Sequence, residues 1–340
     1  MSRPLHTLPK AHLHLHFTGS MRPGTLLELA ARYGVRLPQA LRTASPPQLS
    51  TEDARGWFRF QRLYDIARSV VRTEADMRRI VLEAAEDDRA EGSGWLELQI
   101  EPTSYAAHLG GLHPTLDIVL SAAGEATERT GVGIGLIVAA NRTKHPYDAR
   151  TLARLAARYA DRGVVGFGLS NDEHAGRTAD FAPAFRIAAD AGLLTDPHGG
   201  ELAGAANVWA CVDLLGARRI GHGVRSVEDP RLLEQLAIRG ITLEVCPSSN
   251  VALGVAASYG DVPVRRLVEA GVGVALAADD PLLFGSRLAR QYEVAREHLA
   301  FNDNALADLA RRSIVASTAP ADVQSALLTG VDAWLTEYPC

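Results

Sequence analysis

The strongest constraint on the fold of this chain is the alternation of short strand-like runs with longer amphipathic stretches. Seven runs from residue 95 onward have the apolar composition of buried strands, and each precedes a helical pattern. They read WLELQI, GIGLIVAA, VVGFGL, LLTDPH, RIGHG, ITLEVC and VGVALAA. With the opening AHLHLHF they make eight strands without an internal sequence repeat. The alternation predicts an α/β protein, a single (β/α)8 TIM barrel domain over residues 1–340.

The connections between the strands favour the barrel over an open, doubly wound sheet. Helical patterns over residues 146–161, 228–239 and 262–270 have Pro near their starts, and Gly stands just past several helix ends, as is usual at helix termini. The first strand is not followed by the GxGxxG motif that a dinucleotide-binding sheet would carry.

An oversized segment separates the first two strands. Residues from about 20 to 93 contain three helical patterns, of which the second, GWFRFQRLYDIARSVV, is rich in aromatic side chains. The first is expected to open with a capping box of Thr25 and Glu28, and the third to begin at Thr73. An insertion at the catalytic end of a barrel is a candidate lid, and we expect this helical segment to form one.

Composition and charge exclude several classes of partner. The chain has 340 residues, a formal net charge of -5 and arginines scattered among Asp and Glu, so nucleic acid is not an expected partner. Its apolar runs are too short for a membrane span and its N-terminus lacks an apolar signal core, which predicts a cytoplasmic protein without membrane association. Cys211, Cys246 and Cys340 suit neither a disulfide framework nor a CxxC knuckle. Any metal must therefore be held by His and carboxylate side chains. A homo-oligomer is a possible assembly of this chain.

Three histidines stand at alternate positions in the first predicted strand, namely His12, His14 and His16. This alternation predicts that all three imidazoles point to the same side of the strand. The outer pair would lie about 13 Å apart, too far to share one ion, whereas neighbours about 6.6 Å apart can converge on it. We expect His14 and His16 as ligands, with His12 one layer deeper, in the core or supporting the ligands.

Polar residues at the predicted strand ends indicate a metal site, because barrel enzymes build their sites at the carboxyl ends of the strands. In chain order these residues are His14 and His16, then Asn171, Asp172 and Glu173, then His198 with Glu201, then His222, and finally Asp279 with Asp280. Three imidazoles and the Asp279 carboxylate suit a cation such as zinc and leave a position for water. A lone buried histidine such as His222 is more often a core residue than a catalyst. The Asp172 and Glu173 pair could equally cap the next helix.

Five motifs in order, PKAHLHLHFTGS, HGGE, RIGHG, CPSSN and AADDP, resemble those of the adenosine deaminase family within the amidohydrolase superfamily. The resemblance covers essentially the whole chain. It implies one Zn2+ per chain, held by His14, His16, His198 and Asp279. It also implies that Glu201 protonates N1 of a purine and that His222 orients and helps to deprotonate the attacking water. Asp280 would hydrogen-bond N7 and the hydroxyl that attacks C6.

The chemistry of these residue types agrees with hydrolytic deamination of a 6-aminopurine nucleoside to the 6-oxopurine with release of ammonia. Attack on C6 breaks the aromaticity of the ring, and a carboxylic acid at N1 relieves the charge that develops, so Glu201 must be protonated when it acts. A closed, apolar site would raise its pKa accordingly.

Two neighbouring classes of metal enzyme fit the motifs less well. Binuclear superfamily members typically carry a bridging lysine or glutamate at the end of the fourth strand, which here reads VVGFGLSN, so a single metal is expected. Zinc deaminases with HxE and PCxxC motifs are set aside because no second cysteine follows Cys246 at the needed spacing.

Three departures from the family pattern concern the sugar end of the expected pocket. Thr18 stands where typical members carry a carboxylate for the ribose 5′-hydroxyl, His12 replaces a glutamate, and Asn171 replaces a glycine. A threonine cannot supply a charged acceptor, and charge-assisted hydrogen bonds are roughly twice as strong as neutral ones. We expect Thr18 and Asn171 to bind substrate whose 5′ end is not a free hydroxyl.

This pattern favours the family branch that deaminates 6-amino-6-deoxyfutalosine, an adenine nucleoside of menaquinone biosynthesis with a carboxyphenyl ketone chain on its 5′ carbon. Such a substrate would favour a neutral residue at position 18, apolar walls and a basic group for the benzoate. The candidates in and near the lid are Phe58, Trp57, Phe60, Arg59 and Arg22, with Phe58 expected to contact the substrate. Adenosine or adenine remains the alternative substrate, with the aromatic residues only packing the lid helix.

Two functions of other classes stay open on the same fold. Another metal-dependent hydrolase, such as an amidase or phosphoesterase, predicts a bridged metal pair, so a metal content near two per chain would favour it. A catalytically silent binding protein would not need an acid and a base beside the metal, whereas Glu201 and His222 are expected to add nothing to metal binding.

Overall fold

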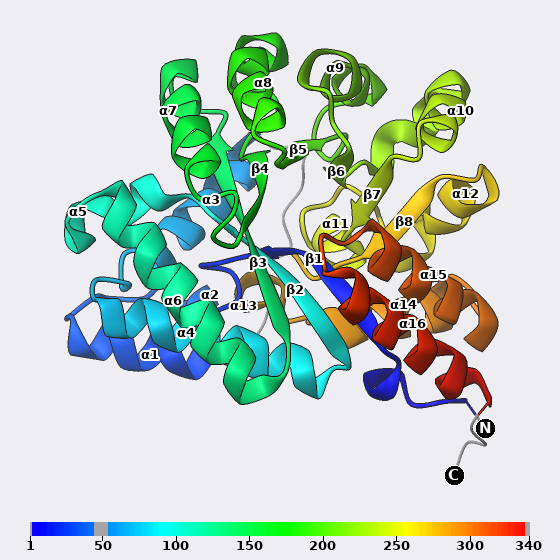
Figure 1. Cartoon of the computed structure of the whole chain (residues 1–340), viewed down its shortest axis with the longest axis horizontal. Helices are drawn as coiled ribbons and strands as arrows, with labels where there is room; N and C mark the ends of the chain where they lie inside the picture. Colours follow the sequence, from blue (N-terminus) through cyan, green and yellow to red (C-terminus); the bar gives the residue numbers. More distant parts are fainter. Residues whose placement is uncertain (1, 44–53, 337–340) are drawn as a thin grey trace.

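The computed structural model describes residues 2–43 and 54–336, with the backbone alone at residues 54 and 55, and contains eight parallel strands in the order β1 to β8 (Figure 1). The strands are β1 Lys10–His16, β2 Ser93–Ile100, β3 Gly133–Asn141, β4 Val164–Ser170, β5 Leu194–Gly199, β6 Arg219–His222, β7 Thr242–Val245 and β8 Gly273–Leu276. A parallel bridge between Leu15 and Asp279 joins the first strand to the segment after the last. The predicted (β/α)8 barrel and its eight strands are confirmed.

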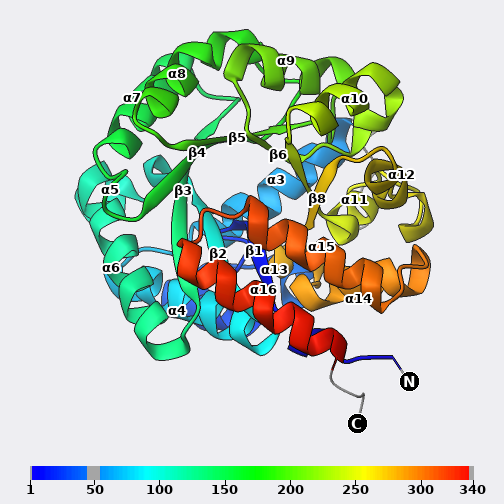
Figure 2. The ribbon, with the colours of Figure 1, turned by 45° about the vertical axis from the view of Figure 1, so that its right-hand side comes forward.

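Helices cover the outside of the strand ring (Figure 2). Those after β2 are α5 Ala106–Leu109, α6 Leu112–Thr130, α7 Pro146–Ala157, α8 Ala182–Asp190, α9 Ala205–Leu215, α10 Pro230–Ile238, α11 Pro247–Ala252, α12 Val264–Glu269, α13 Pro281–Phe284, α14 Leu288–His298, α15 Asp303–Ala316 and α16 Ala321–Thr336. Short 3-10 turns lie at Leu5–Thr7, Pro102–Ser104, Thr178–Phe181, Val224–Glu228 and Tyr259–Asp261. The helices cover the outer face of the strands, and side chains inside the barrel cover the inner face. Strands β1, β5, β6 and β7 are therefore buried almost throughout. Within the described ranges, no helix has the length and apolar content that crossing a membrane requires.

The insertion between β1 and β2 folds into the helices α1 Pro23–Arg32, α2 Gln39–Arg42, α3 Ala54–Arg68 and α4 Glu74–Ala90. The predicted capping box of Thr25 and Glu28 is wrong. Pro23 begins α1 two residues earlier, because proline fits the first turn of a helix, and the buried Thr25 hydroxyl donates to the Glu83 carboxylate. The predicted start at Thr73 is confirmed, and there Thr73 forms a capping box with Asp76.

His12 joins the insertion to the barrel. Its Nδ1 lies 2.9 Å from Oδ1 of Asp88 on α4, and its Nε2 accepts a hydrogen bond of 3.1 Å from the backbone N–H of Ala278 beyond β8. Both ring nitrogens are therefore used, and His12 is a buried supporting residue, as its depth in the strand predicts.

A layer of buried charge lies inside the barrel. The Arg219 guanidinium pairs with the carboxylate of Glu97 and lies 2.7 Å from Glu244 and 3.5 Å from Asp196. Glu97 also accepts hydrogen bonds from the Trp95 indole and from the backbone N–H and hydroxyl of Thr318. Burial alone would raise the pKa of Glu97, but Arg219 and these donors hold it below its usual value.

Replacing Glu97 by Gln is expected to lower the free energy of unfolding by about 3 kcal/mol, because the remaining buried charges lose a partner. Urea unfolding followed by circular dichroism measures the loss. The control is Glu74→Gln, since Glu74 is 55% exposed and pairs with Arg78 on the surface; its cost should stay below about 1 kcal/mol. Equal losses of unfolding free energy in the two variants would contradict a special contribution of the buried pair to stability.

Candidate active site

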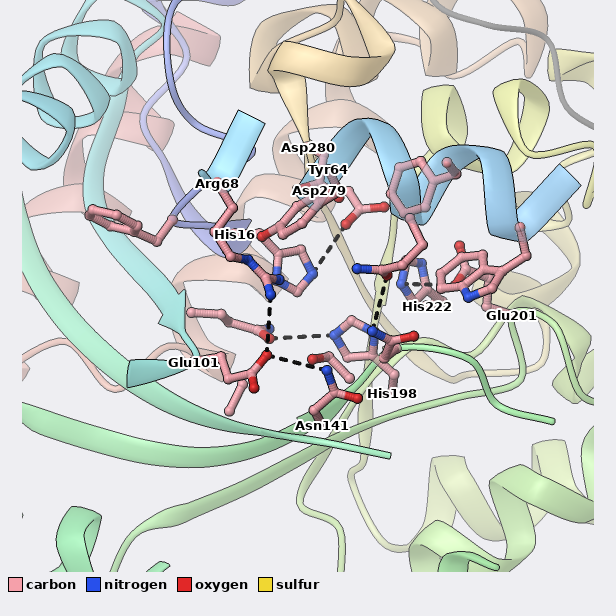
Figure 3. A pocket seen from close by; sticks show the side chains of 18 of the residues that line it. His16, Tyr64, Arg68, Glu101, Asn141, His198, Glu201, His222, Asp279 and Asp280 are labelled. Carbon is pink, nitrogen blue, oxygen red and sulfur yellow. Dashed lines mark hydrogen bonds and ion pairs between the residues drawn. The ribbon is translucent and has the colours of Figure 1, made fainter. Parts of the chain in front are cut away.

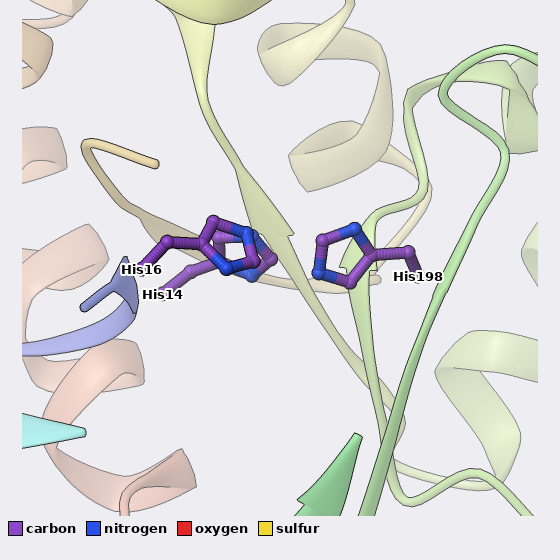
Figure 4. Close-up of side chains that lie close together, drawn as sticks. All are labelled: His14, His16 and His198. Carbon is purple, nitrogen blue, oxygen red and sulfur yellow. The ribbon is translucent and has the colours of Figure 1, made fainter. Parts of the chain in front are cut away.

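Three strands bring four histidines together at the carboxyl end of the barrel. His14 and His16 belong to β1, His198 to β5 and His222 to β6. The ring centroids of His14, His16 and His198 are 5.1, 4.6 and 5.2 Å apart (Figure 4). The His222 ring lies 4.9 Å from those of His14 and His198. The predicted convergence of these strand ends is thus present in the fold.

The surroundings of His14 fit a metal ion. Its Nδ1–H donates to the Glu244 carboxylate over 2.7 Å, and its Nε2 is buried with no hydrogen-bond partner among the described residues. A carboxylate behind the ring orients a metal-binding histidine in this way. Candidate ligand atoms lie within 4.8 Å of one another in three overlapping triplets: His14, His16 and His198; His14, His222 and Asp279; His16, Asp279 and Asp280. The four predicted ligands all fall within these triplets.

Asp279 is held beside the histidines in an uncommon backbone conformation. Its φ of 62° lies in the left-handed region, as does the φ of 65° at His222, and such strain is concentrated at functional sites. One carboxylate oxygen lies 3.3 Å from Nε2 of His16, and the other accepts the Ser249 hydroxyl over 2.6 Å. Burial alone would raise the pKa of Asp279, but the imidazoles of His14 and His16 hold it well below its usual value. Asp279 is therefore an ionised carboxylate, as a metal ligand must be.

Glu201 is a buried carboxyl group at the edge of this cluster. Its Oε2 lies 3.5 Å from Nε2 of His222, and its Oε1 has no hydrogen-bond partner in the described part of the chain. Burial, followed by the negative charges of Asp279 and Glu173, raises the pKa of Glu201 well above its usual value. This environment favours the protonated acid.

His222 and Asp280 are the other two polar residues beside the histidine cluster (Figure 3). Burial lowers the pKa of His222 to about 3, so that its imidazole is neutral and able to accept a proton. Burial and the neighbouring charge of Asp279 raise the pKa of Asp280 well above its usual value. The arrangement thus offers a neutral imidazole and two carboxyl groups with raised pKa values around one candidate metal position.

A pocket that is partly open to solvent is lined by these residues and by the lid helix. From the lid helix α3 it is lined by Trp57, Phe60, Gln61, Tyr64 and Arg68. From the barrel it is lined by His16, Phe17, Gln99, Glu101, Tyr105, Ala139, Asn141, Ser170, Asn171, His198, Glu201, His222, Leu253, Asp279 and Asp280. The insertion therefore covers the catalytic end of the barrel, where a lid is expected.

Comparison with known proteins assigns the family. The model of the adenosine deaminase family matches residues 9–334. The chain belongs to the adenosine deaminase family. Over 335 residues, 98% of this chain and 99% of the relative, it is 64% identical to a putative adenosine/adenine deaminase of Streptomyces virginiae. An adenine deaminase of Rhizobium leguminosarum bv. trifolii is 36% identical over 325 residues, 94% of this chain and 98% of the relative.

A solved adenine deaminase from Arthrobacter aurescens has the same fold, with a TM-score of 0.88 and 28% identity over 97% of this chain and 99% of that one. This member of the adenosine deaminase family is accordingly a hydrolase that acts on carbon–nitrogen bonds, of the adenosine and adenine deaminase type.

Among the predicted substrate-binding residues of this deaminase, Asn171 and Asp280 line the pocket. Asn171 has a φ of 80° in the position of the family's glycine, and its Nδ2 donates to Oε1 of Gln61 on the lid over 3.0 Å. Asparagine tolerates this left-handed conformation better than most residues, which explains how it replaces glycine there.

Two predicted substrate contacts lie outside the pocket lining. Thr18 is fully buried behind the pocket wall, where its hydroxyl bonds to that of Tyr105, so Tyr105 and not Thr18 faces the cavity. Phe58 is 67% exposed and absent from the lining, because helix α3 turns Trp57 and Phe60 inward and Phe58 outward. Among the basic candidates, Arg22 bonds to Asp87 away from the pocket.

Several lining residues were missed, above all Tyr64, Arg68, Glu101 and Tyr105. The lid residues that line the pocket recur every three or four positions from Trp57 to Arg68, which is the spacing of one helix face. That periodicity could have found Tyr64 and Arg68. Glu101 follows β2 directly, and the rule for strand ends could have found it as well.

Glu173 positions the loop that carries Glu201. Its carboxylate accepts hydrogen bonds from the backbone N–H groups of Gly200, Glu201 and Ala203 at 3.0, 2.9 and 3.0 Å, and from the Asn207 side chain at 2.9 Å. The alternative that Glu173 caps the next helix is wrong, because its acceptors are taken by this distant loop. Its charge also lies close enough to raise the pKa of Glu201.

Replacing Glu173 by Gln is expected to shift the alkaline limb of the pH profile of kcat/KM to lower pH. The active acid is protonated Glu201, and removal of a nearby negative charge makes its ionisation easier, so activity is lost at lower pH. The control is Asp172→Asn, because the Asp172 carboxylate accepts hydrogen bonds only from His174, two residues further along, in the described structure. An alkaline limb that stays in place in Glu173→Gln would contradict the electrostatic coupling.

Proposed function

We propose that this chain is a zinc-dependent deaminase of 6-aminopurine nucleosides and that its substrate is 6-amino-6-deoxyfutalosine. Water is consumed, the exocyclic amino group leaves as ammonia, and the purine becomes a 6-oxopurine. The observation that carries the reaction is the position of Glu201, a buried carboxyl group with a raised pKa, beside His222 and the histidine cluster.

The proposed metal is one zinc ion, held by His14, His16, His198 and Asp279. Three imidazoles and one carboxylate match the ligand preferences of zinc and leave one position for water. When bound, the ion would lower the pKa of a water molecule to about 7 and so supply a nucleophile at neutral pH.

In the proposed reaction, side chains beside the histidine cluster accept and donate the protons. His222 accepts a proton of the attacking water at Nε2, the ring nitrogen that lies 3.5 Å from Glu201. Glu201 donates its proton to N1 as the C6–O bond forms, which relieves the charge on the ring. Asp280, whose pKa is also raised, holds N7 by a hydrogen bond. Cleavage of the C6–N bond with protonation of the amino group then releases ammonia.

Two features of the outer pocket support the extended nucleoside. Thr18, at the position where typical members carry a carboxylate for the ribose 5′-hydroxyl, is buried against Tyr105 and offers no charge. Trp57, Phe60 and Tyr64 line the lid side of the pocket and provide apolar walls for an aryl chain. Plain adenosine or adenine is the second candidate, favoured by the descriptions of the Streptomyces and Rhizobium relatives.

Replacing Glu201 by Gln is expected to lower kcat by roughly 100-fold or more, because general acid catalysis typically contributes that much. Metal content near one zinc per chain and the thermal unfolding midpoint should match the unsubstituted protein. The control Glu269→Gln alters an exposed carboxylate and should keep full activity. A chelator should abolish the activity of the unsubstituted protein, and zinc should restore it; full activity in Glu201→Gln would contradict the mechanism.

On purified protein, kcat/KM for 6-amino-6-deoxyfutalosine is expected to exceed that for adenosine and adenine by at least about tenfold, which corresponds to 1.4 kcal/mol of transition-state binding. Ammonia release from each substrate measures this. Equal or better turnover of plain adenosine would contradict 6-amino-6-deoxyfutalosine as the substrate. It would not contradict the deaminase reaction.

A further inference from the structure

The outer pocket contains a cation, Arg68, whose ion pairs with carboxylates of the described residues are long. Arg68 is the last residue of α3, and its side chain is only 19% exposed. Its nearest carboxylates, Asp65 and Glu101, lie 3.6 and 3.8 Å away, beyond hydrogen-bond distance. Its Nε is buried without a hydrogen-bond partner among the described residues. A buried guanidinium with an unused donor is costly and calls for an acceptor.

Glu101 is a largely buried acid near Arg68, and Figure 3 marks its long ion pair with Arg68 and its hydrogen bond with Asn141. One oxygen accepts from the Lys144 ammonium and the Thr103 hydroxyl, and the other accepts from Nδ2 of Asn141 over 3.3 Å. Lys144 therefore neutralises Glu101. Asp65 is 55% exposed and accepts from the Gln61 side chain, so solvent screens its charge. Arg68 thus lines the pocket as a guanidinium whose ion pairs, at 3.6 and 3.8 Å, are longer than hydrogen bonds.

Arg68 lies beside the tyrosines that line the lid side of the pocket. Its guanidinium carbon lies 4.9 Å from the centroid of the Tyr64 ring, and Tyr64 and Tyr105 both line the pocket beside it. Tyr105 in turn bonds to Thr18, the position at which the family's sugar-binding carboxylate is missing. A ligand that leaves the purine site along these aromatic rings reaches the guanidinium.

We propose that Arg68 binds a carboxylate carried on the 5′ side of the nucleoside and so selects arenecarboxylate-bearing substrates; this inference rests on the proposed deaminase function. A guanidinium presents two parallel N–H donors that match the two oxygens of one carboxylate. A phosphate dianion would need further cations, and the other cation of this region, Lys144, is already paired with Glu101. A carboxylate therefore fits the charge of the subsite better than a phosphate.

The test compares Arg68→Met with the unsubstituted protein on 6-amino-6-deoxyfutalosine and on its methyl ester, which removes only the negative charge. The ratio of kcat/KM for the acid to that for the ester is expected to fall by roughly 10- to 100-fold in Arg68→Met, since a hydrogen bond to a charged group is lost. Most of the change should lie in KM. Arg68→Lys should recover part of it, because lysine keeps the charge but loses the planar fork.

Arg62→Met is the matched control, since Arg62 lies on the exposed face of the same helix and should leave the ratio unchanged. Thermal unfolding verifies that each variant folds. Equal losses for acid and ester in Arg68→Met would overturn the proposal in favour of a structural role. A preference of the unsubstituted protein for adenosine 5′-monophosphate over the carboxylate substrate would also overturn it, by assigning the subsite to phosphate.

Binding of benzoate, followed by NMR titration, separates this proposal from the proposed deaminase activity. Benzoate should bind the unsubstituted protein and Arg62→Met with the same affinity, and Arg68→Met about tenfold or more weakly. This result would support the subsite even if no deamination were found. Unchanged benzoate affinity in Arg68→Met would overturn the subsite even in an active deaminase.

Discussion

The seam between β1 and the segment after β8 is the constraint on which the rest of the site depends. The backbone N–H of His16 donates to the carbonyl of Asp279, and the N–H of Asp279 donates to the carbonyl of His14, both over 3.1 Å. These bonds join the first strand to the end of the barrel and hold His14 and His16 beside Asp279. A slip of one residue in β1 would turn both imidazoles away from the site, because side chains alternate along a strand. Closure of the fold and assembly of the candidate metal site are therefore the same event.

Burial then separates the roles of three neighbouring carboxyl groups. Asp279 contacts two imidazoles, and its pKa is held well below the usual value, whereas burial raises those of Glu201 and Asp280. Close carboxyl groups cannot all ionise in a low-dielectric pocket, so the group with cationic or hydrogen-bonding partners takes the charge. The same pocket thereby holds a candidate metal ligand and two carboxyl groups whose raised pKa values suit an acid.

Beneath this layer, Glu244 connects the site to the barrel core, since it accepts from His14 on one side and pairs with Arg219 on the other. Above it, helix α3 provides both the aromatic walls and the unpaired Arg68 donor. The barrel thus supplies the candidate reaction groups, while the inserted lid supplies a wall of the pocket to which our proposal assigns substrate selection.

The sequence alone determined the eight strands, the barrel and the residues gathered at the strand ends, because the alternation of strand and helix patterns is local and parallel strands share one catalytic edge. It did not determine which residues of the lid face inward: Phe58 points outward while Tyr64 and Arg68 line the pocket. It also missed that Thr25 and Thr18 are buried against Glu83 and Tyr105, partners more than fifty residues away in the chain. Only the tertiary structure decided these matters, because the rotation of a helix about its axis and the partner of a buried hydroxyl depend on what packs against them.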